Sequence, residues 1–402
     1  MNRSTPLILV AWGLISLPLH GRSESPVESL DRIWSVAREN IYPADRQEIF
    51  SEAAHATLKH QLEGADSSQQ LAVVVNPFLD RLKVSHTRLY AEPDLDYYFF
   101  RSLFATHDAN FPKVSHVGGQ FQTTSNGAVL VKAVLEGFPL HAAGLRRGDR
   151  ILDVDGQPFH PVLSFQRERA CRLAFKRNGR RHYVEIRPVH TGLPEAFLAA
   201  TSNSVTIFQA GKRKVGYVHL WFGGFNSDLL LSNIVRTEFQ SQADALILDL
   251  RDGFGAAWWN HLDPFYPDRS EYFISTTVSR DGNRDTLKPE PRRNPGHFSG
   301  PMVVLINEDV RSGKEALAYQ FKKTGRAVLI GTRTAGAFLA GKGFFTNEDH
   351  GYLLYLAVKG VLLDGNAIEG RGIAPDTEIA YPLDQVLTKD PQLEAALKHL
   401  GS

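Results

Sequence analysis

The sequence predicts an α/β protein, in which a core of mostly parallel strands and helices follows a helical segment and a β-rich module. Three observations lead to this fold class. Apolar residues recur at helical spacing near the N-terminus, short alternating runs broken by Gly and Asn follow, and continuous apolar runs separated by a helical pattern fill the second half. We therefore expect three parts, at residues 26–110, 112–190 and 195–402.

Composition limits the class of partner. The chain has 402 residues, of which 43% are hydrophobic, with 45 Lys plus Arg against 44 Asp plus Glu. This length exceeds one ordinary hydrophobic core, and the balanced charge gives no field that attracts nucleic acid or anionic lipid. Peptides, proteins or small molecules are the expected partners. Cys171 is the only cysteine, so it forms no intramolecular disulfide and fits a small buried hydrophobe better than a nucleophile.

The first residues carry a targeting pattern. Arg3 precedes an apolar stretch from Leu7 to Leu19 that contains Pro18 and ends before small and polar residues. A membrane span needs about 20 apolar residues, so this stretch fits a signal peptide over residues 1–23 better. The prediction is an exported protein, periplasmic or secreted, without a stable membrane span after cleavage. An uncleaved N-terminal anchor is the alternative.

The segment from Pro26 onward predicts helices. "SPVESLDRIWSVAREN", "DRQEIFSEAAHATLKHQLEG" and "SSQQLAVVVNPFLDRLK" place apolar residues at helical spacing. The helical pattern stops at "VSHTRL", which places Ser85 and His86 in a loop.

The β-rich part, residues 112–190, contains alternating runs such as "HVGGQFQTT" and "RRHYVEIRP". Its stretch "FPLHAAGLRRGDRILDVDGQPF", residues 138–159, resembles the signature of PDZ domains. That resemblance implies that Val117, Gly118 and Gly119 present backbone N–H groups to the C-terminal carboxylate of a peptide, which binds by adding a strand. The alternative is a PDZ fold that serves only as a spacer or lid.

The last part predicts buried parallel strands. "ADALILDLRDG", "GPMVVLINED" and "RAVLIGTRTAG" are continuous apolar runs bounded by turn residues, and a helical pattern separates the last two. Residues 352–370 then read as a hairpin. In open α/β sheets, ligand sites lie at the carboxyl ends of the parallel strands, so the loops after these runs are the candidate site.

Two interpretations are open for Ser312, in "NEDVRSGKEALAYQFKK". With Glu315 it forms the pattern of a capping box. Alternatively it is a nucleophile in the positive field of a helix N-terminus, near "LDLRDGFG", whose free N–H groups are able to hold an oxyanion. A serine nucleophile needs a base, and His86 is the candidate because it lies in a loop between two hydroxyl residues.

Five stretches carry a family resemblance: "VSHTRL", "LILDLRDGFG", "VLINEDVRSGKEALAYQFK", "VLIGTRTAG" and "IEGRGIAPDTEI". In this order, with a PDZ-like module after the first, they resemble the C-terminal processing (tail-specific) serine peptidases and their tricorn-type relatives. The resemblance implies a crotonase-like (ClpP-type) α/β core, an N-terminal helical subdomain and an inserted PDZ domain. It also implies cleavage of peptide bonds through an acyl-enzyme. No metal or organic cofactor is expected, since "SHTRL" lacks the paired spacing of a zinc site.

The resemblance assigns roles to single residues. Processing peptidases pair the serine with a lysine, but the expected position holds Ala337, and Lys342 lies five residues further on. The tricorn-type members use a serine–histidine pair and a glutamate, and this chain matches them without a shift. The implied set is nucleophile Ser312, base His86, orienting residues Glu369 and Ser85, and oxyanion donors Gly313 and Gly255, with Gly253 as the alternative to Gly255.

One departure from the family motivates the first of two rival functions. Relatives carry a run of glycines where this chain reads "DLRDGFGAAWW". The rivals are a catalytically silent protein that binds peptides or hydrophobic ligands, and a hydrolase of other acyl compounds. Phe254, Trp258 and Trp259 in this stretch either form a substrate pocket or cover the core, and large aromatic residues favour the core.

Overall fold

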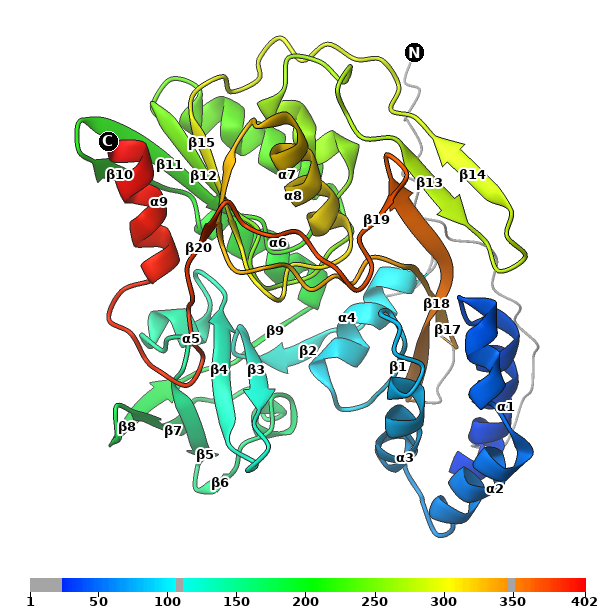
Figure 1. The fold of residues 1–402 in the computed structure, drawn as a ribbon. Helices are drawn as coiled ribbons and strands as arrows, with labels where there is room; N and C mark the ends of the chain where they lie inside the picture. The colour runs from blue at the N-terminus through cyan, green and yellow to red at the C-terminus, as the bar shows by residue number, and fades with distance from the viewer. Residues whose placement is uncertain (1–23, 106–110, 346–350) are drawn as a thin grey trace. The chain divides into compact units, whose positions relative to one another are not determined.

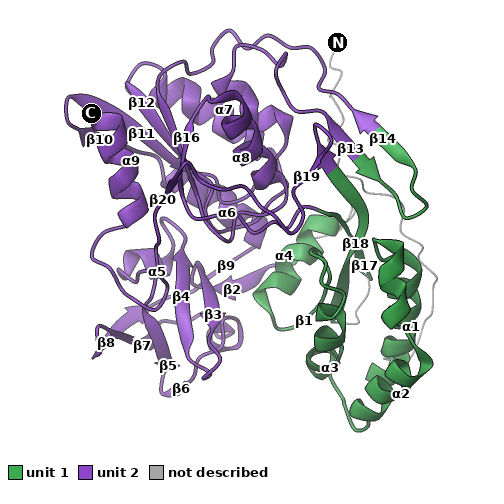
Figure 2. Cartoon of the chain, viewed as in Figure 1, with its two compact units in different colours: residues 1–112, 277–285, 339–361 green, residues 113–276, 286–338, 362–402 purple. Residues whose placement is uncertain are grey.

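The computed structural model describes residues 24–105, 111–345 and 351–402 (Figure 1). The predicted signal peptide, residues 1–23, lies outside these ranges. The chain forms two compact units (Figure 2). Unit 1 comprises residues 1–112, 277–285 and 339–361, and unit 2 comprises residues 113–276, 286–338 and 362–402.

Serine side chains cap three helices of unit 1. Ser25 forms a capping box with Glu28, and the side chains of Ser51 and Ser67 each accept a backbone N–H of the helix that follows. The apolar faces of these helices share one core with buried residues of the unit's sheet. The helices are α1 (Pro26–Asn40), α2 (Glu52–Gln61), α3 (Ser68–Asp80) and α4 (Leu95–Phe104).

The sheet of unit 1 is organised around one long strand, β18 (Tyr352–Leu363), whose last two residues continue into unit 2. Arg88 to Ala91 of β1 pair with Tyr355 to Tyr352 of β18 in antiparallel register. Residues 277–285 and 339–361 thus lie with the N-terminal helices, whereas the sequence places them in the core. The reason is packing: Leu354 and Leu356 are buried among the apolar side chains of the helices. The remaining strands are β1 (Arg88–Ala91), β13 (Ser275–Val278), β14 (Arg284–Leu287) and β17 (Ala340–Phe344), while β19 (Asn366–Ala367), which pairs with the end of β18, belongs to unit 2.

Unit 2 contains the predicted parallel sheet. Its strand order is β10-β11-β12-β15-β16-β20, and every neighbouring pair after the first is parallel. The central strands are buried on both faces, which explains their continuous apolar runs. The strands are β10 (Thr206–Ala210), β11 (Arg213–His219), β12 (Ala245–Asp249), β15 (Met302–Ile306), β16 (Val328–Gly331) and β20 (Thr377–Glu378).

Helices cover both faces of this sheet (Figure 1). Ala396 and Leu400 of α9 pack against Ile247 and Leu305 on one face of the sheet. The residues next to Ile247 and Leu305 in their strands point to the other face, because side chains alternate along a strand. Helix α8 follows β15 and leads into β16, so it is the crossover of a parallel pair. The helices are α6 (Leu193–Asn203), α7 (Ser227–Ile234), α8 (Gly313–Thr324) and α9 (Pro391–Gly401).

The β-rich module also belongs to unit 2. Strands β3, β4, β5, β7 and β8 form one antiparallel sheet, with β6 paired to β5, over a small core that includes Cys171. Strands β2 and β9 pair with each other where the chain enters and leaves the module. The elements are β2 (Val114–His116), β3 (Gly119–Thr123), β4 (Val129–Val134), α5 (Pro139–Ala142), β5 (Arg150–Val154), β6 (Gln157–Pro158), β7 (Cys171–Arg177), β8 (Arg180–Ile186) and β9 (Val189–Thr191).

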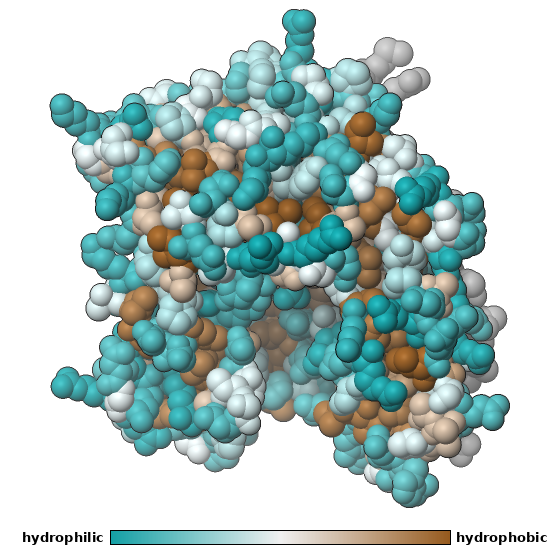
Figure 3. Space-filling view, viewed as in Figure 1, coloured by the Kyte–Doolittle hydropathy of each residue, from teal (hydrophilic) through white to brown (hydrophobic). Residues whose placement is uncertain are grey.

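Hydrophilic and apolar side chains are interspersed on the face drawn in Figure 3. Within the described ranges, the exposed large apolar side chains come from separate elements, among them Val73 on α3, Leu229 on α7 and Tyr183 on β8. None of the helices in these ranges is long and apolar enough to cross a membrane.

Candidate active site

Ser312 follows β15 and lies at the N-terminal end of α8, as the sequence predicts. Its backbone adopts φ 54° and ψ −136°, a conformation that non-glycine residues rarely take. Its N–H donates to the Ala337 carbonyl at 2.8 Å. Ser312 occupies the N-cap position, but its side chain makes no capping hydrogen bond, so the capping-box prediction was wrong.

Glu315 explains why the capping box does not form. Its buried carboxylate accepts hydrogen bonds from Thr334 Oγ1 at 2.6 Å, Gly336 N at 2.8 Å and Ala337 N at 2.9 Å. Burial, with a further contribution from Glu369, raises the pKa of Glu315 to about 7 against the effect of these bonds. Glu315 therefore fixes the loop after β16, which in turn holds the N–H of Ser312.

Two glycines lie against the nucleophile candidate. A Cβ added at Gly255 would lie 2.5 Å from Ser312 Cβ and 3.1 Å from its Oγ, and one at Gly313 would lie 2.0 Å from the Ala257 carbonyl oxygen. Among the described residues, neither glycine N–H has a hydrogen-bond acceptor. Gly253, the alternative donor, is already engaged, because its N–H donates to Gln120 Oε1 of the β-rich module at 2.9 Å. The geometry thus favours Gly255 over Gly253 as the partner of Gly313.

The aromatic residues of the same loop belong mainly to the core. Phe254 and Trp259 are buried, and the indole N–H of Trp259 donates to the Phe273 carbonyl. Trp258 is half-buried and lies edge-on to the Phe273 ring. The core interpretation is therefore confirmed for Phe254 and Trp259.

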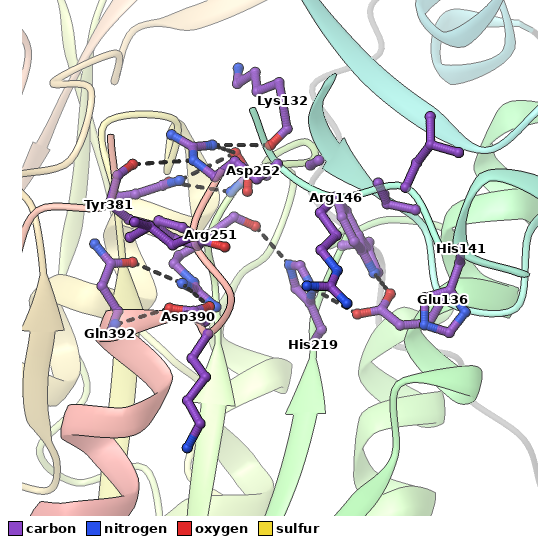
Figure 4. A pocket seen from close by; sticks show the side chains of 18 of the residues that line it. Lys132, Glu136, His141, Arg146, His219, Arg251, Asp252, Tyr381, Asp390 and Gln392 are labelled. Atoms are coloured by element: carbon purple, nitrogen blue, oxygen red, sulfur yellow. Dashed lines mark hydrogen bonds and ion pairs between the residues drawn. The ribbon is translucent and has the colours of Figure 1, made fainter. Parts of the chain in front are cut away.

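A buried ionic cluster anchors the loop that follows β12. Arg251 pairs with Asp249 at 2.6 Å and with Asp390, at the start of α9, at 2.7 Å. Burial would raise the pKa of Asp249, but Arg251 and His219 hold it well below its usual range. Figure 4 shows Arg251, Asp252 and His219 on the wall of a cavity of about 410 Å³. The loop thus lines this cavity, and its Asp252 carbonyl accepts a hydrogen bond from Lys314 in the first turn of α8.

Ser85 and His86 belong to unit 1, on the turn between α3 and β1. The Ser85 hydroxyl is hydrogen-bonded to His86 Nδ1 at 2.8 Å, and the ring lies edge-on to Tyr355. His86 has φ 55°, so the sharp turn presents its side chain differently from that of a regular strand.

Glu369 lies in unit 2 with Ser312, and one of its carboxylate oxygens accepts the Phe338 N–H at 2.6 Å. The Gly370 N–H donates to the Gly336 carbonyl, so the glutamate is tied to the loop that holds Ser312. Ala337 contributes only backbone groups here. Lys342, the displaced lysine, lies on β17 of unit 1 with its ammonium 4.9 Å from the centre of the Phe344 ring.

The predicted peptide-binding loop of the module is tightly packed. Val117 is buried, and its carbonyl accepts the Leu140 N–H. The Gly118 N–H donates to His116 Nδ1 at 3.1 Å, and a Cβ at Gly118 or Gly119 would clash with Phe138 or Leu140. The two glycines therefore permit close packing of this loop against α5.

Sequence reasoning did not assign roles to Lys314 or Gln120. Both contact the loop that contains Gly253, from α8 and from the β-rich module. A lysine in the first turn of a helix reads as a solvated surface residue, and a glutamine in an alternating strand carries no signal. Only their burial and their contacts in the folded chain reveal them.

Comparisons with known proteins identify relatives of this chain. Residues 214–379 match the family model described as peptidase family S41. The tricorn protease of Thermoplasma volcanium is 23% identical over 404 residues, which cover 93% of this chain and 36% of that protein. The carboxyl-terminal-processing protease of Synechocystis sp. is 28% identical over 279 residues, covering 66% of this chain and 64% of that protein. The chain spans less than two thirds of either relative.

Solved structures show the same fold. The photosystem II D1 C-terminal processing protease aligns with a TM-score of 0.54 at 20% identity, covering 94% of this chain and 98% of that chain. The crystal structure of the tricorn protease aligns with a TM-score of 0.52 at 17% identity, covering 94% of this chain and 37% of that chain. The family match covers β11 to β20, the strands and loops around Ser312, so the resemblance noted in the sequence is confirmed for this part of the chain: residues 214–379 match peptidase family S41.

Proposed function

We propose that the protein is a serine-type peptidase that cleaves peptide bonds through an acyl-enzyme on Ser312. The observation that carries this proposal is the backbone of Ser312. A serine held at φ 54° at a helix N-terminus, making no capping bond, stores strain that a structural cap does not need. The open N–H groups of Gly313 and Gly255 beside it supply the donors that an oxyanion requires.

In this mechanism His86 Nε2 takes the proton from Ser312 Oγ as the hydroxyl attacks the peptide carbonyl, and later gives it to the leaving amine. Ser85 orients the ring through Nδ1. Glu369 is the acidic member of the set and stabilises the protonated ring. The pairing of unit 1 residues with Ser312 is part of the proposal, supported by the tricorn-type pattern and by a tricorn protease match that covers both halves of the set. The core is inferred to be crotonase-like.

A fluorophosphonate probe tests the proposal directly, because only an activated serine reacts with it covalently. Mass spectrometry of the labelled, digested chain should find the adduct on Ser312. Heat-denatured protein and the Ser312→Ala variant serve as controls and should remain unlabelled. A native chain that stays unlabelled would exclude the peptidase mechanism and leave the silent binding protein as the better interpretation.

The β-rich module is inferred to be a PDZ domain that binds substrate C-termini by strand addition, in an exported protein. Its antiparallel sheet and the resemblance of residues 138–159 to the PDZ signature support this inference. Full-length Ser312→Ala protein, which binds peptides without cleaving them, should hold a peptide with a free C-terminus at least tenfold more tightly than its amidated form. Loss of the terminal charge removes the acceptor for the loop N–H groups. Equal affinities by fluorescence anisotropy would show that the module does not recognise C-termini.

A further inference from the structure

Lys314 is a fully buried lysine two residues after Ser312, in the first turn of α8. Its Nζ donates to the Asp252 carbonyl at 2.9 Å and to the Leu250 carbonyl at 3.3 Å. Within the described ranges, its ammonium forms no ion pair with a carboxylate. Its hydrogen-bond partners are therefore two backbone carbonyls of the loop that follows β12.

This placement is costly for folding. An ammonium without a carboxylate partner loses its hydration, and the N-terminal turn of a helix carries positive partial charge. Burial lowers the pKa of Lys314 to about 7, although Asp249 and Asp252 act in the opposite direction. A buried charge can often be replaced by an apolar residue of similar size without loss of stability. Stability therefore gives no clear reason for a lysine here, and the two carbonyls it binds point to another role.

The bonds of Lys314 fix the orientation of one peptide plane. In a trans peptide the C=O and N–H groups point in opposite directions. Because the Asp252 carbonyl points to Lys314, the Gly253 N–H points away from it, to Gln120 Oε1 at 2.9 Å. The plane between Asp252 and Gly253 is thus held on both sides. Gly253 also has φ 63°, and a Cβ there would lie 2.0 Å from the Trp221 carbonyl oxygen.

The constraint extends to Gly255. The Phe254 N–H donates to the Trp221 carbonyl at 2.9 Å, and the Gly255 carbonyl accepts the Gly223 N–H at 2.8 Å. These bonds follow directly on the plane that Lys314 holds. They leave the Gly255 N–H as the group of this loop that is open beside Ser312.

We propose that Lys314 is a positioning residue, whose ammonium holds the Leu250 and Asp252 carbonyls so that the Gly255 N–H faces the oxyanion. The role in catalysis rests on the proposed peptidase function. The structural order of the loop at residues 250–255 does not rest on that function, and amide exchange measures it separately.

The charge of Lys314 makes the effect depend on pH. The charged groups around it are Asp249 on β12, Asp252 in the loop, and Asp309 and Arg311 before α8. With a pKa of about 7, the ammonium loses its proton as the pH rises through that value, and its charge-assisted bonds to the carbonyls weaken. The loop should lose order on the alkaline side, whereas protonation of a histidine base lowers the rate on the acid side. The expected kcat profile is a narrow bell.

The test compares Lys314→Met with Lys323→Met, a control on the same helix whose ammonium binds the Glu271 carbonyl at an exposed position. We expect Lys314→Met to lower kcat by about 10- to 100-fold with KM within about twofold, because the interaction acts on the transition state. The alkaline limb of the kcat profile should disappear. Amide exchange of residues 250–255 should accelerate at pH 6, while Lys323→Met matches the wild type in every measurement.

The proposal would be overturned if Lys314→Met kept the wild-type kcat, the alkaline limb of the kcat profile and the wild-type rate of amide exchange at residues 250–255. If that variant does not fold, the pH dependence of amide exchange in the wild type tests the proposal instead. Its protection factors for residues 250–255 should fall relative to those of β15 between pH 6 and pH 8.5, and an unchanged ratio would overturn the proposal. An unlabelled Ser312 together with pH-dependent protection would contradict the peptidase function alone, since exchange requires no activity.

Discussion

Replacing His86 by alanine should lower kcat by about three to five orders of magnitude, while Lys342→Met retains most of the wild-type activity. Without the base, catalysis that remains comes from binding and the oxyanion site. The Ser85 hydroxyl is hydrogen-bonded to Nδ1 of His86, and the proposed mechanism assigns the proton transfer to Nε2. The Lys342 ammonium instead lies over the Phe344 ring on β17, and Ala337 occupies the position where the family's lysine is expected.

Two further measurements sharpen this prediction. Glu369→Gln should lose less than His86→Ala, because it weakens charge stabilisation of the base without removing it. The rate of the wild type should fall as the pH drops below about 6.5, the ordinary pKa of a histidine. Steady-state kinetics on a peptide substrate would measure all four proteins. An inactive Lys342→Met beside an active His86→Ala would reverse the assignment and favour a serine–lysine dyad.

Gly255→Ala should lower kcat by about 100- to 1,000-fold, the cost of losing one oxyanion donor. The new Cβ would lie 2.5 Å from Ser312 Cβ and 2.8 Å from the Arg311 carbonyl oxygen, closer than the 3.0 Å that real Cβ atoms keep. Either the loop or Ser312 must shift, and both shifts misalign the donor and the nucleophile.

Gly296→Ala is the matched control, because a Cβ there meets nothing within 4 Å. It should have wild-type kcat and wild-type labelling by the fluorophosphonate probe. Gly255→Ala should also react more slowly with the probe, since phosphonylation uses the same oxyanion site. Because alanine keeps its N–H, a Gly255→Ala protein with wild-type kcat would show that the expected displacement of the loop or of Ser312 does not affect catalysis.

Much of the fold follows from local patterns. The apolar runs of β12, β15 and β16 identify parallel buried strands, and the helical spacing of apolar residues near the N-terminus identifies helices that the structure confirms. Pairings between distant segments leave no such signal. Nothing near residue 352 indicates that β18 joins β1, because strand partners are chosen by packing rather than by sequence separation.

In the candidate site, too, some features follow from local sequence and others depend on contacts between distant segments. The positions of Ser312 and Gly255 follow from strand ends and from the order of the motifs. The missing capping bond does not, because Glu315 binds a loop about twenty residues further along the chain. The burial of Lys314 is equally hidden, since a helix surface position becomes an interior position only when a neighbouring loop folds over it.

The composition of unit 1 has a consequence for the order in which the chain becomes native. Its helices and β1 end by residue 112, but β18, whose Leu354 and Leu356 complete their core, comes from residues 352–361. At ribosomal speeds of about 5–20 residues per second, roughly 12–50 seconds separate the synthesis of these segments. During that interval the apolar faces of α1 and α3 lack their covering strand. The earliest part of the polypeptide to be made is therefore among the last to mature, and the nascent chain needs protection from aggregation for most of its synthesis.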